Sequence, residues 1–157
     1  MERISLSVID RLIDQDPRTS TEAPLSHAQS VRAHKESVRR DLEWLLNTRR
    51  IAEPPPESLR EVNRSLYLYG LPDFTTYSIA NPKDQARLIR FLQSAVKQFE
   101  PRLSNARLVA IENTESKSRK LRFRIEALLL MDPLPEHVTF DTVLQLTTGQ
   151  VEVKDAG

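Results

Sequence analysis

Cysteine is absent from this 157-residue chain, and glycine and aromatic residues are scarce. Without thiols, the protein forms no disulfides and has no thiolate chemistry. The glycines lie at positions 70, 149 and 157, which is too sparse for a glycine-rich loop around a phosphate group. Nucleotide binding through such a loop is therefore excluded. No apolar run approaches the length of a membrane span, so we expect no direct membrane insertion.

Residues that would carry metal or acid chemistry are also few. His27, His34 and His137 are scattered, and none pairs with a glutamate at a spacing that places two metal ligands on one face. We expect all three to be solvated surface residues, with no metal and no cofactor. A glycosidase acid needs a raised pKa, whereas a nearby cation such as Arg102 favours the charged form of a carboxylate such as Glu100. We therefore expect no enzymatic activity.

The charge is nearly balanced, with a formal net charge of +1 at pH 7. Basic residues concentrate between residues 32 and 50 and between 117 and 124, while acidic residues dominate after residue 132. Such patches steer charged partners. The near-zero total argues against a dedicated nucleic-acid binder, which is usually basic overall. The first residues lack the basic and then apolar layout of a signal peptide, so we expect a cytoplasmic protein.

Three segments have helical periodicity. The first spans residues 31–50, the second spans 59–69 after a capping-box spacing that begins at Ser58, and the third spans 83–99 after Asn81-Pro82. Gly70 is placed to end the second helix in a left-handed turn. We expect the core stripes to be Val38, Leu42, Leu45 and Leu46 in the first helix, and Leu88, Ile89, Leu92, Ala95, Val96 and Phe99 in the third.

The last third changes to the alternating period of strands, at residues 108–112, 121–131, 138–146 and 151–153. The second half of segment 121–131 is apolar on both sides, which predicts that both of its faces are covered. This order predicts an α+β fold, in which N-terminal helices pack on one face of a three- to four-stranded, mainly antiparallel sheet. We expect one domain at residues 31–157, preceded at residues 1–30 by a docking helix and a flexible linker.

Two loops and the N-terminal segment are candidate functional elements. Residues 7–13 predict a short helix with an apolar side formed by Val8, Ile9 and Leu12, which either folds back on the domain or docks onto another subunit. The loop after Gly70 holds Leu71, Asp73 and Phe74, either as core residues or as a rigid partner-binding loop.

The third helix ends at a turn with adjacent opposite charges. Pro101 cannot continue the helix, so Glu100 and Arg102 stand side by side at a fixed bend. They either pair locally, which contributes little when exposed, or reach a neighbouring subunit through a charge-assisted hydrogen bond.

The strands hold the last candidates. Arg122 and Arg124 form a stripe that is either a solvated sheet face or, at a sheet edge, part of a surface that accepts a strand from another chain. Val151 and Val153 begin the final short strand, which we also consider a partner contact.

The order of these motifs resembles a known family. The Glu100-Pro101-Arg102 turn, together with Tyr69-Gly70-Leu71-Pro72-Asp73-Phe74, resembles the baseplate wedge family of contractile injection machines. The similarity runs from about Ser7 to about Val153 and is greatest to the TssE-type baseplate subunits of type VI secretion systems. Residues 7–12 resemble the N-terminal motif of those subunits.

The resemblance implies a non-enzymatic structural subunit. Its implied partners are other wedge subunits, of the TssF, TssG and TssK type, and sheath proteins of the TssB and TssC type. The N-terminal segment and the Glu100-Pro101-Arg102 turn would contact the wedge. The C-terminal strands would contact the sheath and serve as a template for it by strand exchange. The implied location is the cytoplasmic side of the inner-membrane secretion complex.

Three alternatives stay open at this point. The chain also fits the equivalent wedge protein of a contractile phage tail or tail-derived particle. A peptidoglycan hydrolase is an alternative of a different class, because the family carries a "lysozyme-like" label. A free-standing small adaptor is the third.

Overall fold

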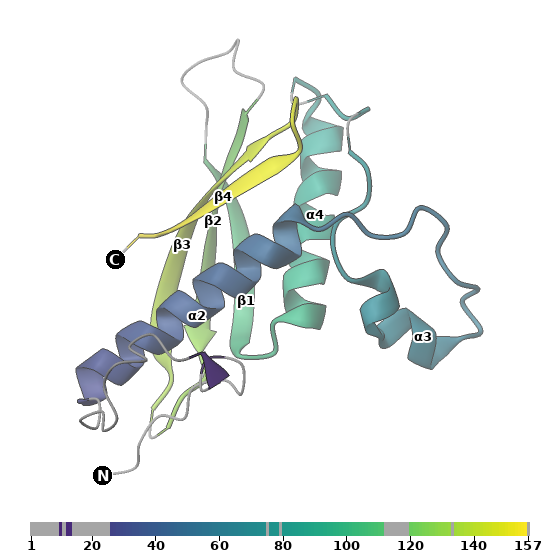
Figure 1. Ribbon diagram of the computed structural model, residues 1–157. Helices are drawn as coiled ribbons and strands as arrows, with labels where there is room; N and C mark the ends of the chain where they lie inside the picture. The colour runs from purple at the N-terminus through teal and green to yellow at the C-terminus, as the bar shows by residue number, and fades with distance from the viewer. Residues whose placement is uncertain are drawn as a thin grey trace.

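The computed structural model describes residues 10, 12–13, 26–74, 76–78, 80–111, 120–132 and 134–156. Two long helices, α2 (His27–Asn47) and α4 (Pro82–Phe99), pack against a four-stranded antiparallel sheet (Figure 1). The strands are β1 (Leu103–Ile111), β2 (Lys120–Leu129), β3 (Glu136–Gln145) and β4 (Gln150–Asp155), in the order β1-β2-β3-β4. This arrangement confirms the predicted α+β fold. Within the described ranges, no helix is both long and apolar enough to cross a membrane.

The helix α2 begins four residues earlier than predicted. Ser26 caps it by accepting the Gln29 N–H, and the Gln29 side chain bonds back to the Ser26 N–H, so the two form a capping box. Residues 27–30, which the sequence assigns to the linker, are therefore helical. The predicted core stripe of α2 is confirmed, because all four of its residues are buried.

The helix α4 confirms its sequence signals closely. The Asn81 side chain accepts the Lys83 N–H, and Pro82 occupies the first turn. Within its predicted stripe, Ile89 and Phe99 are partly buried against the core, and Leu88, Leu92, Ala95 and Val96 are buried.

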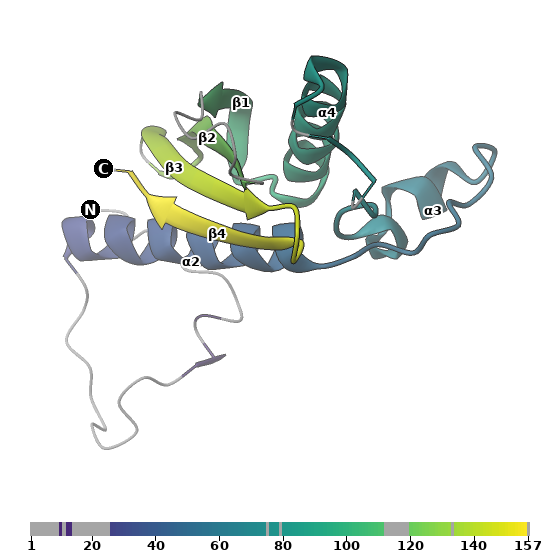
Figure 2. The ribbon, with the colours of Figure 1, turned by 90° about the horizontal axis from the view of Figure 1, so that it is seen from above.

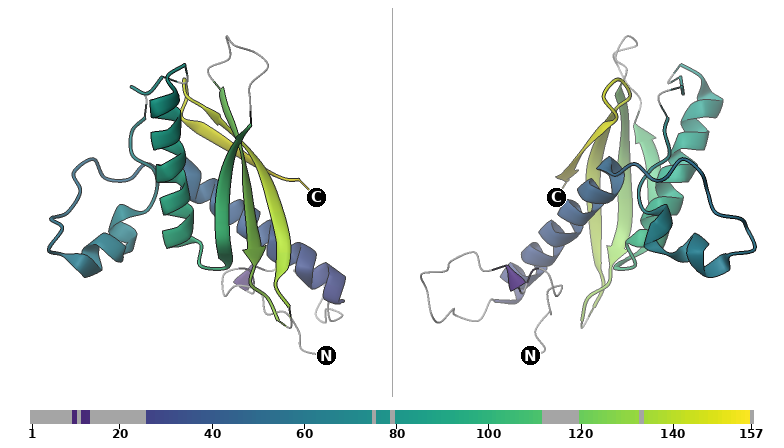
Figure 3. Two further views of the ribbon diagram at one scale, coloured as in Figure 1. Left: turned by 180° about the vertical axis from the view of Figure 1, so that it is seen from behind. Right: turned by 45° about the vertical axis from the view of Figure 1, so that its right-hand side comes forward.

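The predicted helix 59–69 is confirmed only in its first half, and its prediction as one continuous helix is wrong. A five-residue helix, α3 (Arg60–Arg64), is followed by a 3-10 turn, η1 (Leu66–Leu68), and Ser58 does not cap α3 with its side chain. The break occurs at Ser65, whose hydroxyl donates to the Val62 carbonyl and accepts the Tyr67 N–H. Serine competes for backbone bonds in this way and so interrupts a helix. Both elements extend to one side of the molecule (Figure 3).

Gly70 has the left-handed conformation that the sequence predicts, with φ +100°. A Cβ atom at this position would overlap the Thr48 carbonyl group. The close approach lets the Leu71 N–H donate to the Thr48 carbonyl at 2.7 Å and the Arg50 N–H donate to the Leu71 carbonyl at 3.0 Å. These bonds join the two ends of the loop that contains α3 and η1.

The sheet buries one face against both helices. Along β2 the buried residues alternate with solvent-facing ones, and the buried set is Leu121, Phe123, Ile125, Ala127 and Leu129. The prediction that the second half of this strand is covered on both faces is wrong, because Leu128 is half-buried and Leu130 is exposed. The helices lie on one face of the sheet, and β4 runs directly beside α2 (Figure 2).

The strand β1 is longer than predicted, since it starts at Leu103 directly after the Glu100-Pro101-Arg102 turn. Its register shifts between Ser104 and Arg107, at Asn105, whose φ is +53°. A bulge of this kind resets the alternation of inward and outward side chains. The alternation of apolar and polar residues that would predict a strand is therefore absent from the sequence before residue 108.

Candidate partner-binding site

Glu100 and Arg102 form a close ion pair at the end of α4. Arg102 donates from Nε to Glu100 Oε1 and from Nη2 to Glu100 Oε2, both at 2.6 Å. Glu100 is 3% exposed, so this carboxylate depends on Arg102 for compensation. The bidentate geometry is the strong form of such a pair.

Arg102 also joins the turn to α2. Its Nη2 donates to Asp41 Oδ2 at 2.6 Å, and its Nη1 donates to Ser37 Oγ at 3.1 Å. Burial opposes the charged form, but the hydrogen bonds and charges of Glu100, and then of Asp41, raise the pKa of Arg102. The guanidinium is thus held between three groups of its own chain.

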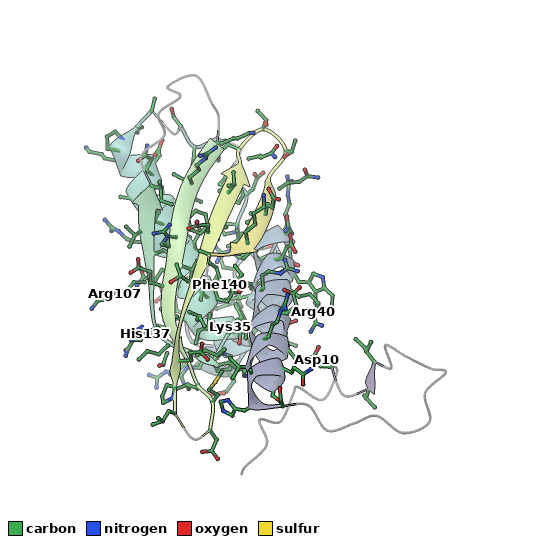
Figure 4. The ribbon with its side chains drawn as sticks, turned by 90° about the vertical axis from the view of Figure 1, so that its left-hand side faces the viewer. Asp10, Lys35, Arg40, Arg107, His137 and Phe140 are labelled. Carbon is green, nitrogen blue, oxygen red and sulfur yellow. The ribbon has the colours of Figure 1, made fainter. Side chains whose placement is uncertain are left out.

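The N-terminal segment reaches the same network through Asp10. Asp10 Oδ1 accepts from Arg40 Nη1 at 2.7 Å, and Asp10 Oδ2 accepts from Ser37 Oγ at 2.6 Å. Arg40 also donates to Asp41, so Asp10, Arg40, Asp41, Arg102 and Ser37 form a closed ring of hydrogen bonds. Figure 4 shows Asp10 beside α2, near Arg40. Two elements that the sequence singles out separately therefore meet on α2.

The apolar side of the N-terminal segment is only partly described. Leu12 is 78% exposed and Ile13 is 50% exposed. The predicted contact residues Val8 and Ile9 lie outside the described residues. At Asp10 the segment lies on its own domain, and Leu12 faces solvent.

His34 lies beside this ring and corrects a prediction. A solvated histidine is predicted here from the sequence, but His34 is 6% exposed and its Nδ1 has no hydrogen-bond partner among the described residues. Burial, and then the charge of Arg102, lower its pKa, although Glu100 and Asp10 act in the opposite direction. The helical stripe of α2 includes position 34, one turn before Val38, and this spacing was the available signal.

A cavity of about 230 Å³ opens at the turn. Its charged lining is Asp41, Glu100 and Arg102, and its apolar walls are Trp44, Leu45, Tyr69 and Phe99. Tyr69 packs edge-on against Phe99, with ring centroids 5.3 Å apart, and burial raises the pKa of its hydroxyl. Trp44 is 53% exposed, and the Arg40 guanidinium lies 5.1 Å from the centre of its ring.

The loop after Gly70 contributes less surface than a binding loop would. Leu71 and Phe74 are buried in the core, while Asp73 is exposed. The structure thus places two of these three predicted contact residues in the interior.

Arg122 and Arg124 lie in the middle of the sheet, and they do not form an edge. They belong to β2, which pairs with β1 on one side and β3 on the other. Arg124 donates to Asp141 on β3 at 2.7 Å. Because both flanking ladders are occupied, the strand-accepting role that the sequence analysis makes conditional on an edge position does not apply to these residues.

Val151 and Val153 do lie on an edge strand, but α2 covers that edge. Asn47 donates from Nδ2 to the Val151 carbonyl at 2.8 Å and accepts the Val151 N–H at 2.9 Å. Arg39 donates to the Val153 carbonyl at 3.1 Å. The side chains of both valines are buried. The outer edge of β4 therefore already has partners for groups that would otherwise bind a new strand.

The opposite edge, β1, is more open. Gln93 donates to the Ala106 carbonyl at 3.4 Å. From Arg107 to Ile111, no hydrogen bond from another described element reaches the outer side of the strand. Val109 and Ile111 are 48% and 37% exposed. Figure 4 shows Arg107 on the side of the sheet away from α2.

Several of these residues escape sequence reasoning. Asp10, Ser37, Asp41 and Asn47 carry the ring and the edge cover, yet each is a common polar residue on or near a helix. The i,i+4 spacing of Ser37 and Asp41 places them on one helix face, which was the single local signal. Across the part of the chain that the structure describes, no group of three or more His, Asp or Glu side chains is arranged to hold a metal ion.

Comparison with known families adds one match. The family model described as baseplate wedge protein gp25 matches residues 32–134, which is more than half of the chain. The match includes α2 from residue 32 onward, α4, β1, β2 and the Glu100-Pro101-Arg102 turn, whereas Asp10, β3 and β4 lie outside it. No curated protein and no solved structure matches the chain.

Proposed function

Because the chain belongs to the baseplate wedge protein gp25 family, we propose that it is a non-enzymatic structural subunit of a type VI secretion baseplate wedge. It links the larger wedge proteins to the contractile sheath and is the template on which sheath assembly starts. Its partners are TssF-, TssG- and TssK-like wedge subunits and TssB- and TssC-like sheath proteins, on the cytoplasmic side of the secretion complex.

The cavity beside the Glu100-Pro101-Arg102 turn carries the wedge contact in this proposal. Arg102 donates to Glu100, to Asp41 and to Ser37, so the charges of Glu100 and Arg102 mainly fix the turn. The exposed aromatic surface next to them belongs to Trp44. Tryptophan in a partly formed pocket is typical of the residues that dominate binding energy at interfaces. We propose that a wedge subunit inserts an apolar side chain here and packs it against Trp44.

The experiment is co-purification of the tagged chain from its native cytoplasm, followed by mass spectrometry. Trp44→Ala should reduce recovery of the wedge subunits at least about tenfold while the melting temperature is unchanged. Leu134→Ala is the matched control, because Leu134 is also an exposed large apolar residue but does not line the cavity. Full recovery with Trp44→Ala would refute this contact, and absence of all baseplate proteins from the wild-type sample would refute the function. Recovery of phage-tail proteins would favour the tail-derived alternative.

The proposed absence of enzymatic activity has its own test. Both carboxylate oxygens of Glu100 accept from Arg102, which leaves this group poorly placed to donate a proton to a glycosidic bond. Purified cell walls should keep their turbidity in the presence of the wild-type chain. A loss of turbidity that Glu100→Gln abolishes would overturn this part of the proposal.

We place the sheath contact on β1, because α2 covers the edge of β4. An incoming sheath strand would pair with the stretch from Arg107 to Ile111, where Val109 and Ile111 already present apolar surface. Lysine on an edge strand blocks such pairing. Val109→Lys/Ile111→Lys should therefore stop sheath polymerisation, while Glu152→Lys on β4, which is also an exposed position, should not. The reverse result would assign the sheath contact to β4, as the sequence analysis predicts.

A further inference from the structure

A second cavity, of about 340 Å³, lies along α2 on the N-terminal side of the ring. Its basic lining is Arg32 and Arg40, and Ser37 supplies a hydroxyl between them. Glu36 also lines it, but Arg39 holds that carboxylate at 2.7 Å. We call the surface formed by Arg32, Ser37 and Arg40 the α2 groove.

A carboxylate from a distant part of the sequence already occupies one end of the α2 groove. Asp10 accepts one hydrogen bond from Arg40 and one from Ser37, and 11% of its side chain is exposed. A partly buried carboxylate that accepts from a guanidinium and a hydroxyl is a specific contact, because each oxygen has a defined donor. The contact with Asp10 thus shows that the α2 groove binds a carboxylate.

The other end of the α2 groove has a second, exposed cation, whose charge acts on the neighbouring carboxylate Glu36. Arg32 is exposed, and no ion pair joins it to another residue that the structure describes. Cavity volume remains beside Asp10, between Arg32 and Arg40. A second carboxylate placed there would meet a basic side chain without displacing an existing partner.

The two apolar residues of the N-terminal segment that the structure describes add little to its contact with α2. Leu12 and Ile13, two and three residues after Asp10, are both at least half exposed. The hydrogen bonds from Arg40 and Ser37 replace hydrogen bonds to water, so their net contribution to binding energy is modest. Asp10 is therefore an occupant that a better ligand would replace.

From these observations we propose that the α2 groove is a docking site for an acidic peptide segment. In the isolated chain Asp10 occupies it in cis. In the assembly a segment of a neighbouring protein, with carboxylates spaced to reach both Arg40 and Arg32, takes its place. That the neighbour is a baseplate subunit rests on the proposed function, whereas the test below does not depend on it.

The test uses full-length chains and a labelled synthetic peptide that corresponds to residues 4–16, which contain Asp10, Asp14 and Asp16. The chain with Asp10→Ala has an empty groove and should bind the peptide. Wild type, whose groove is occupied in cis, should bind it at least about tenfold more weakly. Asp10→Ala combined with Arg40→Ala should lose the binding again. Fluorescence anisotropy measures each affinity.

Two controls keep the result specific. A peptide that carries Asp10→Asn has the same shape and should bind the emptied groove at least about tenfold more weakly. If Asp10→Ala does not fold, Asp10→Asn in the full chain replaces it, and circular dichroism and the melting temperature decide that point. Equal peptide binding by wild type and the emptied chain, or no binding by the emptied chain, would overturn the proposal.

Sedimentation of the wild type separates the partner from a second copy of the chain. The proposal expects a monomer whose mass does not change with concentration. A dimer that Asp10→Ala dissociates would mean that the groove takes the N-terminal segment of another copy, and would overturn the assignment to a different subunit.

Discussion

Arg102→Met should destabilise the fold more than any surface substitution would. The change removes the cation that binds both oxygens of Glu100, whose side chain is only 4% exposed. It also removes a donor to Asp41 and one to Ser37. Without its partner, a buried carboxylate keeps the full cost of its desolvation. Removing the partner therefore destabilises the fold by more than the net contribution of the intact pair.

The magnitude follows from how buried each group is. Breaking a buried pair costs about 3–5 kcal/mol. The Arg102 side chain is 24% exposed, so water compensates part of the loss and we expect about 3 kcal/mol. For a domain of this size, each kcal/mol lowers the melting temperature by about 2–4 °C, which gives a decrease of about 6–12 °C.

The double variant Glu100→Gln/Arg102→Met distinguishes pairing from packing. It removes both charges and leaves a neutral amide in the buried position, so it should recover most of the loss and remain within about 1–2 kcal/mol of wild type. Urea unfolding at pH 7 measures the free energy of unfolding of all four members of the cycle. If Arg102→Met costs less than about 0.5 kcal/mol, or if the double variant is as unstable as the single one, the reasoning is refuted. A stability loss of the predicted size also means that weaker partner capture by a variant at this turn is interpretable only beside its melting curve.

Three further predictions test the loop base, the buried histidine and the covered edge. Gly70→Ala should lower the free energy of unfolding, measured with urea, by about 1–3 kcal/mol, because a Cβ at φ +100° overlaps the Thr48 carbonyl. An unchanged free energy of unfolding would contradict the loop geometry. The pKa of His34 is lowered from 6.5, so the unfolded state takes up a proton that the folded state excludes, and stability falls as pH decreases below about 6.5. Urea unfolding from pH 7.5 to 5 should show a shallower fall for His34→Gln than for wild type or for the exposed-site control His137→Gln; parallel curves for all three would contradict the assignment. Asn47→Ala should lower the free energy of unfolding by about 1–2 kcal/mol and speed hydrogen exchange of the Val151 amide, because both backbone groups of Val151 lose their partner. Unchanged exchange would show that Asn47 does not stabilise this edge.

The parts of the fold that the sequence predicts are those in which periodicity encodes burial. Val38 and Leu42 on α2, and Phe123 and Ile125 on β2, repeat at the spacing of their element, and all of them are in the core. The start of α4 was predictable because Asn81-Pro82 acts locally, through one side-chain bond and one ring. Such signals need no knowledge of the rest of the chain.

The failures have equally local causes. The spacing from Ser58 to Glu61 satisfies the capping-box pattern, but Ser65 competes for the backbone a few residues later and divides the helix. At Asn105 a bulge shifts the register, so the alternation that would identify the start of β1 is lost. A pattern that is correct residue by residue fails where one side chain or one extra residue changes the backbone path.

The candidate site was predictable in its parts and not in its assembly. Glu100 and Arg102 stand out because Pro101 makes a fixed bend between them, and the segment around Asp10 stands out because the sequence predicts a short helix with one apolar side. Their meeting on α2 depends on a contact between Asp10 and Arg40, which are 30 residues apart in the sequence. No periodic relation connects these residues, and the basic character of α2 alone would have suggested an external acidic partner.

The two edges of the sheet suggest why assembly on this subunit would have a direction. An edge strand with open N–H and C=O groups accepts any extended chain, including a second copy of itself, so a template needs to close every edge that is not in use. On β4 the closure comes from Asn47 and Arg39, whose side chains supply the donors and acceptor that a neighbouring strand would supply. On β1, between Arg107 and Ile111, the described residues supply no such cover. If Asn47→Ala/Arg39→Ala lets a second strand add at β4 and the chain then self-associates, α2 blocks pairing at the β4 edge and leaves the β1 edge available for the proposed sheath contact. A monomeric double variant would mean that the buried faces of Val151 and Val153 restrict that edge on their own.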